Sequence, residues 1–245
     1  MLSTVSPSIY RYKSLPSTND FMKELNGEVG LAEGAVVVCE NQEKGKGVCG
    51  RWESENGKNL TFSIFLKPHS LNISDKQYLN YLVALSISQF LDQFITKVQI
   101  KWPNDILIDS KKVAGVLIEN TFEGKKIKNC IVGIGLNVNQ SHFNKFSRTA
   151  TSIGKEANKQ FDLNSFLNDF LELFFKNYTR LLHSKNKLKE EYLDRLYLKG
   201  SNSNFEIDGV EQQGVIQGLD LNGLLQIELE GGVRSFDLKE IRFLD

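Results

Sequence analysis

The sequence is poor in the residues that build disulfide frameworks and metal centres. Its three cysteines, Cys39, Cys49 and Cys130, form no Cys-x-x-Cys pair and suggest no disulfide pattern. Its three histidines are isolated, so no spacing typical of a zinc site occurs. These absences argue against a disulfide-stapled secreted domain and favour a reducing compartment.

The sequence also lacks an excess of one charge and a long apolar run. Its 245 residues contain 30 Lys plus Arg and 30 Asp plus Glu, so no global charge attracts nucleic acid or anionic lipid. No apolar run approaches the ~18 residues that a transmembrane helix needs, and the N-terminus has no signal-peptide pattern. We therefore expect a cytoplasmic protein that binds neither a membrane nor nucleic acid.

Hydrophobic periodicity divides the chain into two parts. Residues 1–199 combine strand-like runs with long amphipathic helical patterns. Beyond them, short alternating segments are separated by dipeptides that suit tight hairpin turns: Asp208-Gly209, Asn222-Gly223 and Gly231-Gly232. We predict an α+β domain over 1–199 and a small all-β domain, a barrel of five strands, over 200–245.

Local signals within the first part place the individual elements. Ser17 or Thr18 can cap a short helix that Gly27 can end, and Ser74 is placed to cap a long helix over 75–95. The other predicted elements are strands at 34–39, 59–66, 97–101, 105–108, 112–119 and 126–138, and helices at 163–182 and 186–197.

The most informative segment is KWPND (residues 101–105), which precedes a strand-like run that starts at Lys112. Its proline makes the segment a rigid strand and turn. Asp105 is a natural Mg²⁺ ligand, and Asn104 can bind a ligand or hold the turn. A fixed ammonium at Lys112 can offset the repulsion between a carboxylate and a phosphate, while Gly115 lets a ligand lie on bare backbone. The plain alternative is a strand end with solvated charges.

A glycine-rich segment, QEKGKGVCG, runs from Gln42 to Gly50 and contains Gly45, Gly47 and Gly50. Successive backbone N–H groups in such a loop can hold phosphate or carboxylate oxygens. The segment is neither a P-loop nor a Rossmann fingerprint, because the lysine-serine end and the following helix are absent. A flexible surface loop is the alternative. Trp52, which follows the loop, is either a core residue or a ring that stacks on a ligand.

Two further segments carry polar groups next to small residues. Ser17-Thr18-Asn19 can cap a helix and can also present hydroxyl and N–H donors to a ligand. The run GIGLNV (residues 133–138) places two glycines in a strand, which indicates close approach of a ligand or of another backbone. Asn137 needs a hydrogen-bond partner if it is buried. A bulged strand with a satisfied asparagine is the alternative.

Taken in order, STN, Q-x-x-G-x-G-x-x-G-x-W, KWPND, K-x-A-G-x-L-x-E and GIGLNV resemble the motifs of the biotin protein ligases. The resemblance covers nearly the whole chain. It implies a class II synthetase-like catalytic domain, with a mixed sheet and helices, followed by an SH3-like β-barrel. It also implies a two-step reaction in which biotin and Mg·ATP give biotinyl-5′-AMP, and a lysine of a biotin carboxyl carrier domain then takes the biotinyl group.

The resemblance also implies roles for individual residues. Lys112 would be the catalytic residue and Asp105 the Mg²⁺ ligand. The residues implied to bind biotin are Ser17, Thr18, Asn19, Gln42, Gly45, Lys46, Gly47, Val48, Lys112 and Gly115. The residues implied to bind ATP are Arg51, Trp52, Asn104, Asp105, Lys112 and Asn137. Both a monomer and a homodimer are compatible with the sequence.

The chain departs from the family pattern in the glycine-rich loop, where relatives commonly read Gly-Arg-Gly, often with another arginine next. Here Lys46 replaces a planar guanidinium, and Val48 carries no charge, so we expect the adenylate to leak. Sixteen residues precede Ser17, too few for a winged helix, so we expect a ligase without a repressor role. A lipoate or octanoate ligase or transferase, and a non-catalytic biotin-binding module, are the alternatives.

Overall fold

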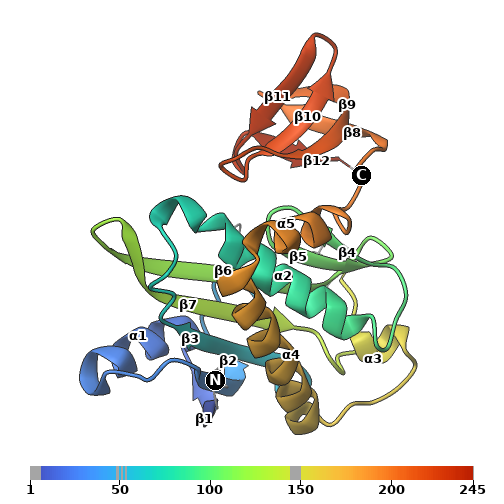
Figure 1. Ribbon diagram of the computed structural model, residues 1–245. Helices are drawn as coiled ribbons and strands as arrows, with labels where there is room; N and C mark the ends of the chain where they lie inside the picture. Colours follow the sequence, from blue (N-terminus) through green and yellow to red (C-terminus); the bar gives the residue numbers. More distant parts are fainter. Residues whose placement is uncertain (1–6, 48–49, 51, 53, 144–149, 245) are drawn as a thin grey trace.

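The computed structural model describes residues 7–47, 50, 52, 54–143 and 150–244. Within them the chain folds into two β-sheets and a set of helices, which the colours of Figure 1 follow from the N-terminus to the C-terminus. In this described part, no helix is both long enough and apolar enough to cross a lipid bilayer.

The larger sheet has seven strands in the order β1-β2-β3-β7-β6-β5-β4. Strands β1 and β2 run parallel, and every other neighbouring pair is antiparallel, so the sheet is mixed. The strands are β1 (Ser8–Leu15), β2 (Ala35–Gln42), β3 (Leu60–Leu66), β4 (Val98–Lys101), β5 (Asp105–Ile108), β6 (Lys111–Glu123) and β7 (Lys126–Leu136). The predicted α+β class with a mixed sheet is confirmed.

One face of this sheet is covered by α2 (Gln77–Leu91), α4 (Leu163–His183) and α5 (Lys185–Leu193), as Figure 1 shows. Alternate strand positions, among them Val36, Phe62 and Ile134, point into this layer and are almost fully buried. The ring of Phe62 meets that of Phe170 from α4 at a centroid distance of 5.7 Å. Apolar burial of this extent makes this face the main hydrophobic core and leaves it no room for a ligand.

Helix α1 (Thr18–Val29) covers only part of the opposite face. Its Met22 is fully buried against Val37 and its neighbours in a second, smaller core. The Ser17 hydroxyl caps the helix start, and Gly30, at a φ of 65°, ends it. The rest of this face, towards β6 and β5, carries small and polar side chains and borders a cavity.

The C-terminal residues form a second, five-stranded sheet in the order β11-β10-β9-β8-β12. Its strands are β8 (Asn202–Ile207), β9 (Val210–Leu219), β10 (Leu225–Leu229), β11 (Gly232–Phe236) and β12 (Ile241–Phe243). Asp208 and Gly209 both adopt positive φ angles, 53° and 77°, between β8 and β9, as the predicted two-residue turn requires. We propose that the domain boundary lies between residues 199 and 200, in the connection from α5 to β8.

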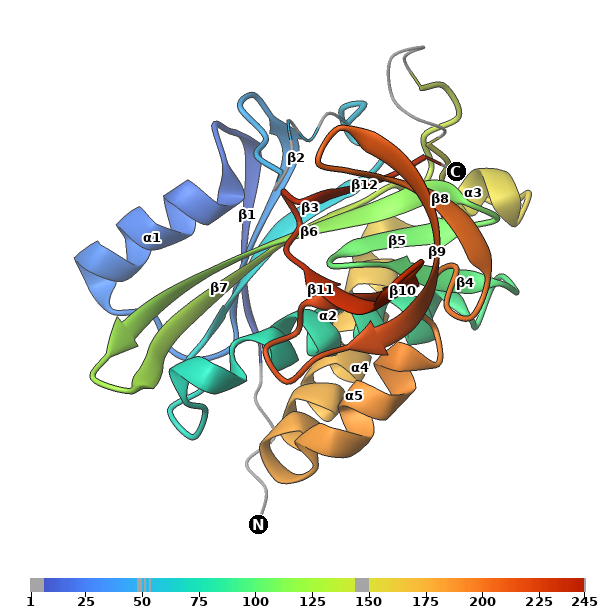
Figure 2. The ribbon, with the colours of Figure 1, turned by 90° about the horizontal axis from the view of Figure 1, so that it is seen from above.

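The second sheet contacts the first part at the KWPND segment. The Trp102 indole N–H donates to the Gly223 carbonyl at 3.0 Å, and the Lys101 ammonium lies 4.7 Å from the centroid of the Phe243 ring. Both contacts join residues more than 100 positions apart in the sequence. Figures 1 and 2 show the second sheet next to β4, β5 and α5.

Two predicted helix ends are wrong. Gly27 does not end α1, because the helix continues to Val29; Gly27 lies in open space, so a helical glycine is tolerated there. Ser74 does not cap α2. It lies inside a short 3₁₀ helix, η1 (Ile73–Asp75), whose own capping box pairs Asn72 with Asp75, and α2 begins afterwards without a side-chain cap.

Three other elements differ from the sequence analysis. Strand β1 is not predicted, because most of its residues are exposed or half-buried and it lies at the sheet edge. Helix α5 ends at Leu193 rather than at 197, where backbone bonds to β4 replace helical ones. The predicted strand 126–138 ends at Leu136, so Asn137 lies just beyond it. A short helix, α3 (Ile153–Glu156), follows.

Candidate active site

A large cavity lies on the open face of the first sheet, with the C-terminal sheet forming part of its wall. Its volume is about 2110 Å³, roughly twice the upper end of the usual range for a single small ligand. The walls come from the ends of β2 and β7, from β5 and β6, from the start of α1, and from β12 with the residues just before it. The cavity therefore has room for two small molecules side by side.

The floor of the cavity is a row of small residues that strand register brings together. Thr61 of β3 pairs with Gly135 of β7, Gly135 pairs with Gly115 of β6, and Gly115 pairs with Asp105 of β5. Directly paired residues point to the same face of a sheet. Thr61 also pairs with Cys39, and Cys39 packs in the smaller core beneath α1. This row therefore lies on the face of the sheet that α1 partly covers.

Glycines in this floor leave space that functional side chains occupy. A Cβ atom on Gly133 would lie 2.4 Å from Oδ1 of Asn19, and one on Gly135 would lie 2.2 Å from Cε2 of Trp52. A Cβ on Gly115 would lie 3.2 Å from Nζ of Lys112. These side chains therefore lie directly on the sheet. The sequence analysis expected a ligand or another backbone to approach these glycines, and the groups found there are side chains of the protein.

One end of the cavity is polar and buried. Ser17, Thr18 and Asn19 are each only 3% exposed. Gln42, at the end of β2, accepts through Oε1 from the Thr18 backbone N–H at 2.9 Å and from the Thr18 hydroxyl at 3.2 Å. This arrangement turns the Nε2 donors of Gln42 away from Thr18 and leaves them for a ligand. The Ser17 hydroxyl accepts from a backbone N–H, so its hydrogen can also be donated.

Asn19 and Ser63 extend this polar end onto the sheet. The Ser63 hydroxyl lies 2.6 Å from Oδ1 of Asn19 and 2.7 Å from the Thr18 hydroxyl. The sequence analysis missed Ser63 and Thr61 as candidates. Their signal is two polar residues at alternate positions of the otherwise apolar, fully buried strand β3, which places both on one face.

The glycine-rich loop folds back on itself beside this end. The Trp52 N–H donates to the Gly45 carbonyl at 3.2 Å, and the Gly47 N–H donates to the Gly50 carbonyl at 2.8 Å. Gly45 itself is not among the residues that line the cavity; a Cβ there would lie 2.2 Å from the Trp52 carbonyl oxygen. The predicted site residues Val48 and Arg51 lie outside the described residues.

Lys46 pairs with a carboxylate of α1. Its Nζ lies 2.7 Å from Oδ2 of Asp20, and both side chains are partly exposed. The hydrogen bond that Lys46 donates to Asp20, together with the negative charge of that carboxylate, raises the pKa of Lys46. The ammonium of Lys46 is therefore held at the cavity edge.

The other end of the cavity is charged. Nζ of Lys112 lies 2.6 Å from Oδ1 of Asp105, and their side chains are 39% and 31% exposed. The Asn104 amide donates to the Val116 carbonyl at 2.5 Å, so this residue holds the turn that presents Asp105. The structure therefore brings Lys112 and Asp105 together as an ion pair at this end of the cavity.

A magnesium ion fits at Asp105 as part of a nucleotide complex. Among the described residues, no three His, Cys, Asp or Glu side chains group so as to hold a metal by themselves. Magnesium commonly takes one or two protein carboxylates and completes its shell with phosphate oxygens and water. The single carboxylate of Asp105 therefore suits Mg²⁺ that enters together with ATP.

Asn137 lines the cavity and is 4% exposed. Its Nδ2 donates to the Thr151 carbonyl at 3.0 Å, while its Oδ1 has no partner among the described residues. The same holds for the indole N–H of Trp52 and the hydroxyl of Thr61, which also line the cavity. Since buried polar atoms are normally paired, three unpaired atoms in one cavity point to a polar ligand.

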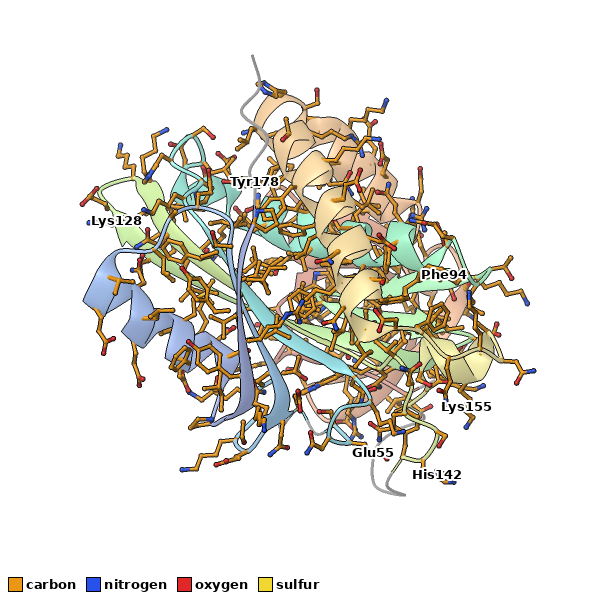
Figure 3. All side chains as sticks on the ribbon, turned by 90° about the horizontal axis from the view of Figure 1, so that it is seen from below. Glu55, Phe94, Lys128, His142, Lys155 and Tyr178 are labelled. Carbon is orange, nitrogen blue, oxygen red and sulfur yellow. The ribbon has the colours of Figure 1, made fainter. Side chains whose placement is uncertain are left out.

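The loop after β7 connects to the glycine-rich loop. Oε1 of Gln140 accepts from the Glu55 N–H at 3.0 Å and from the Asn59 amide at 2.5 Å, and its Nε2 donates to the His142 carbonyl at 2.7 Å. Figure 3 shows Glu55 and His142 at the same edge of the molecule. Gln140 therefore ties two segments that border the cavity.

Comparison with known proteins gives one consistent family. The sequence pattern of the biotin/lipoate A/B protein ligase family matches residues 12–137. The bifunctional ligase/repressor BirA of Bacillus subtilis is 30% identical over 229 residues, which are 90% of this chain and 69% of that protein. The biotin–[acetyl-CoA-carboxylase] ligase of Paracoccus denitrificans is 26% identical over 224 residues, which are 87% of this chain and 92% of that protein.

Solved structures agree with the sequence relatives. The biotin protein ligase of Aquifex aeolicus in complex with biotin and ATP superposes with a TM-score of 0.79 at 26% identity. The superposition covers 96% of this chain and 98% of that one, so both sheets are included. This chain therefore belongs to the biotin/lipoate A/B protein ligase family, and it is a ligase of the biotin protein ligase type.

Proposed function

We propose that this protein activates biotin with Mg·ATP to biotinyl-5′-AMP and transfers the biotinyl group to a lysine of a biotin carboxyl carrier domain. The observation that carries the proposal is the arrangement of one cavity with two unlike ends. A buried hydrogen-bonding end, at Ser17, Thr18 and Gln42, lies across a glycine floor from the charged pair of Lys112 and Asp105. The Aquifex aeolicus ligase binds biotin and ATP.

The polar end matches the ring urea of biotin. A ring urea offers one carbonyl acceptor and two N–H donors. The Ser17 hydroxyl and the Nε2 group of Gln42 can donate to the carbonyl, and Oδ1 of Asn19 can accept from an N–H. In this assignment, Lys46 and Gly47 would border biotin from the loop side, and Gly115 would border it from the sheet.

The charged end matches the reaction centre. The biotin carboxylate attacks the α-phosphorus of ATP, a carbon–oxygen–phosphorus anhydride forms, and pyrophosphate leaves. In this proposal the Lys112 ammonium would contact both the carboxylate and the α-phosphate and would offset their combined negative charge. Asp105 would hold Mg²⁺, which neutralises phosphate charge. Trp52, Asn104 and Asn137, with the undescribed Arg51, would border the nucleotide.

The second step needs no nucleophilic side chain from this chain. The ε-amine of a carrier lysine attacks the acyl carbon of biotinyl-5′-AMP, an amide forms, and AMP leaves with the anhydride oxygen. A mixed anhydride hydrolyses in water, so a loop over the cavity would protect it. We assign this protection to the glycine-rich loop, whose Gly45, Trp52 and Lys46 are held beside the cavity.

A lipoate or octanoate ligase is the alternative within the same family. A dithiolane ring or an alkyl chain offers no hydrogen-bonding groups. It would leave the Nε2 donors of Gln42 and the second lone pair of Asn19 Oδ1 without a ligand partner. Each such unpaired group costs about 1–3 kcal/mol, so the polar end favours biotin over lipoate or octanoate.

Biotin-dependent exchange of ³²P between pyrophosphate and ATP tests the first half of the proposal, with lipoate and octanoate measured beside it. We expect exchange with biotin only. Exchange with lipoate or octanoate instead would show that the protein is a lipoate or octanoate ligase. Exchange with none of the three acids would favour the alternative of a non-catalytic binding module. The second half is tested by transfer to a biotin carrier domain and to its Lys→Arg variant at the acceptor position.

A further inference from the structure

A carboxylate outside the cavity contacts the buried polar end from behind. Glu119 lies on β6, four residues beyond Gly115, and is not among the residues that line the cavity. Its register partner is Ile131, which packs in the α1 core, so Glu119 faces α1. Two residues of α1, Asn19 and Lys23, are four positions apart and therefore lie on the same side of the helix, where both contact Glu119.

The contacts of Glu119 fix the orientation of the Asn19 amide. Oε2 of Glu119 accepts from Nδ2 of Asn19 at 2.7 Å, and Oε1 pairs with the Lys23 ammonium at 2.5 Å. The second hydrogen of Nδ2 is donated to the Leu117 carbonyl at 3.3 Å. An ionised carboxylate only accepts, so the amide nitrogen must face Glu119 and the amide oxygen must face the other way.

The outward-facing oxygen of Asn19 lies against the floor of the cavity. Oδ1 accepts from the Ser63 hydroxyl at 2.6 Å and occupies the space above Gly133 that a Cβ atom would fill. A carbonyl oxygen has two lone pairs, so one remains for a ligand after the bond from Ser63. Asn19 itself is 3% exposed, which makes the wrong amide orientation costly.

We propose that Glu119 is a positioning residue that makes Asn19 present an acceptor, rather than a donor, to the ring urea. The inference rests on the proposed function, because it assigns the partner of Asn19 to an N–H of biotin. Glu119 does not touch the ligand. It acts through the amide of Asn19, and the ion pair with Lys23 holds the carboxylate in place.

The neutral isostere Glu119→Gln should reverse the amide. The Lys23 ammonium carries only donors, so the glutamine oxygen turns towards it, and the glutamine NH₂ then faces Asn19. Two NH₂ groups cannot face each other without loss. Asn19 therefore turns over, gives up its longer bond to the Leu117 carbonyl, and presents its nitrogen to Ser63 and to the ligand. A donor then meets the N–H of the ring urea.

The test measures biotin-dependent ATP–pyrophosphate exchange in the unmodified protein, in Glu119→Gln and in Glu123→Gln. Glu123 is the matched control, because it lies at the end of the same strand and pairs with Lys128 at 2.8 Å, remote from the cavity. We expect Glu119→Gln to raise the KM for biotin about tenfold or more and to leave the KM for ATP within about twofold. Glu123→Gln should change neither constant.

A second variant distinguishes a reversed Asn19 amide from a general loss of structure, because it exchanges the donor at position 19 with the acceptor at position 119. In the double variant Asn19→Asp with Glu119→Gln, the glutamine NH₂ donates to the aspartate, and an oxygen again faces Ser63 and the ligand. This double variant should recover most of the biotin affinity that Glu119→Gln loses. It also keeps the inference testable if Glu119→Gln alone folds poorly.

Discrimination between substrate analogues is a second measurement, and a purely structural role of Glu119 would not change it. In the two carbamate analogues of biotin, one ring N–H or the other is replaced by oxygen. The unmodified protein should reject one of them, and Glu119→Gln should reduce that discrimination about tenfold. Unchanged biotin KM and unchanged discrimination in Glu119→Gln would overturn the inference. If the unmodified protein shows no biotin-dependent exchange, biotin is not its substrate. The proposed function then fails, and the inference about Glu119 fails with it.

Discussion

The indole ring of Trp52 lies on the backbone of Gly135, so closely that a Cβ on that glycine would be 2.2 Å from Cε2 and 2.4 Å from Cδ2 of the ring. Trp52 follows the glycine-rich loop, whereas Gly135 lies in the strand that forms the middle of the cavity floor. The contact sets how deeply the loop sits on the sheet, between the polar and the charged ends of the cavity.

Gly135→Ala should therefore displace Trp52 and reduce adenylation. The added methyl group cannot coexist with the ring, so the loop must rise from the sheet, and a misplacement of about 1 Å near reacting groups can cost on the order of 100-fold in rate. The initial rate of biotin-dependent exchange measures this. Gly27→Ala is the control: nothing lies within 4 Å of that position in α1, so it should stabilise the protein by about 0.5–1 kcal/mol with unchanged exchange.

Lys112→Ala should abolish most of the exchange activity. The variant removes the cation that pairs with Asp105 at 2.6 Å and that would face the α-phosphate. We expect the rate to fall by on the order of 100- to 1,000-fold, the usual effect of losing one group that stabilises transition-state charge. Lys128→Ala, at an ion pair of similar length far from the cavity, should retain full activity. A Lys112→Ala rate within twofold of the unmodified protein would refute the role.

Trp102→Phe should weaken the attachment of the C-terminal sheet. The ring is 6% exposed, and its N–H is donated to the Gly223 carbonyl. Removing the donor leaves that carbonyl unpaired at a cost of about 1–3 kcal/mol. We expect a melting temperature lower by roughly 2–4 °C per kcal/mol and faster hydrogen exchange in β9 and β10. Leu221→Ala, at an 89% exposed position of the same turn, should show neither effect.

Glu156→Gln should destabilise the protein at neutral pH but not in acid. The Thr151 hydroxyl and the Lys111 ammonium lower the pKa of Glu156 below its ordinary value of 4.5. A carboxylate with a lowered folded-state pKa stabilises the fold above the unfolded pKa, and this contribution is lost as the pH falls through the folded pKa. Urea unfolding should therefore show a deficit of about 1–2 kcal/mol at pH 7 that shrinks below pH 4.5.

The matched control for this variant is Glu28→Gln, at an exposed position of α1. It should show no deficit at either pH. A deficit of Glu156→Gln that persists unchanged in acid would contradict the charge-based explanation and point to packing instead.

Val48→Arg should slow the loss of biotinyl-5′-AMP from the protein. This prediction rests on the sequence alone, since Val48 lies outside the described residues. A guanidinium at this loop position can bond a phosphate oxygen, and a charged hydrogen bond corresponds to roughly 10- to 100-fold in dissociation rate. Trapping of released adenylate measures the rate. Val29→Arg, at a 65% exposed valine in α1, should leave it unchanged, and equal rates in Val48→Arg would remove the leakage hypothesis.

The sequence by itself determined the elements and motifs that depend on near neighbours. The cap at Ser17, the long helices α2 and α4 and the hairpin turn at Asp208-Gly209 all follow from local spacing, because side-chain caps, helical periodicity and turn angles involve only a few adjacent residues. The candidate site segments were also visible, because glycine, charge and proline stand out within short windows.

Only the tertiary structure decided how these segments meet. Strand register, which depends on hydrogen bonds between distant strands, aligned Thr61, Gly135 and Gly115 into one floor. Glu119 reaches Asn19 across 100 positions of sequence, and Ser63 gains its role only because Asn19 lies on it. No local pattern carries such contacts, since the free energy that selects them comes from burying the whole sheet against its helices.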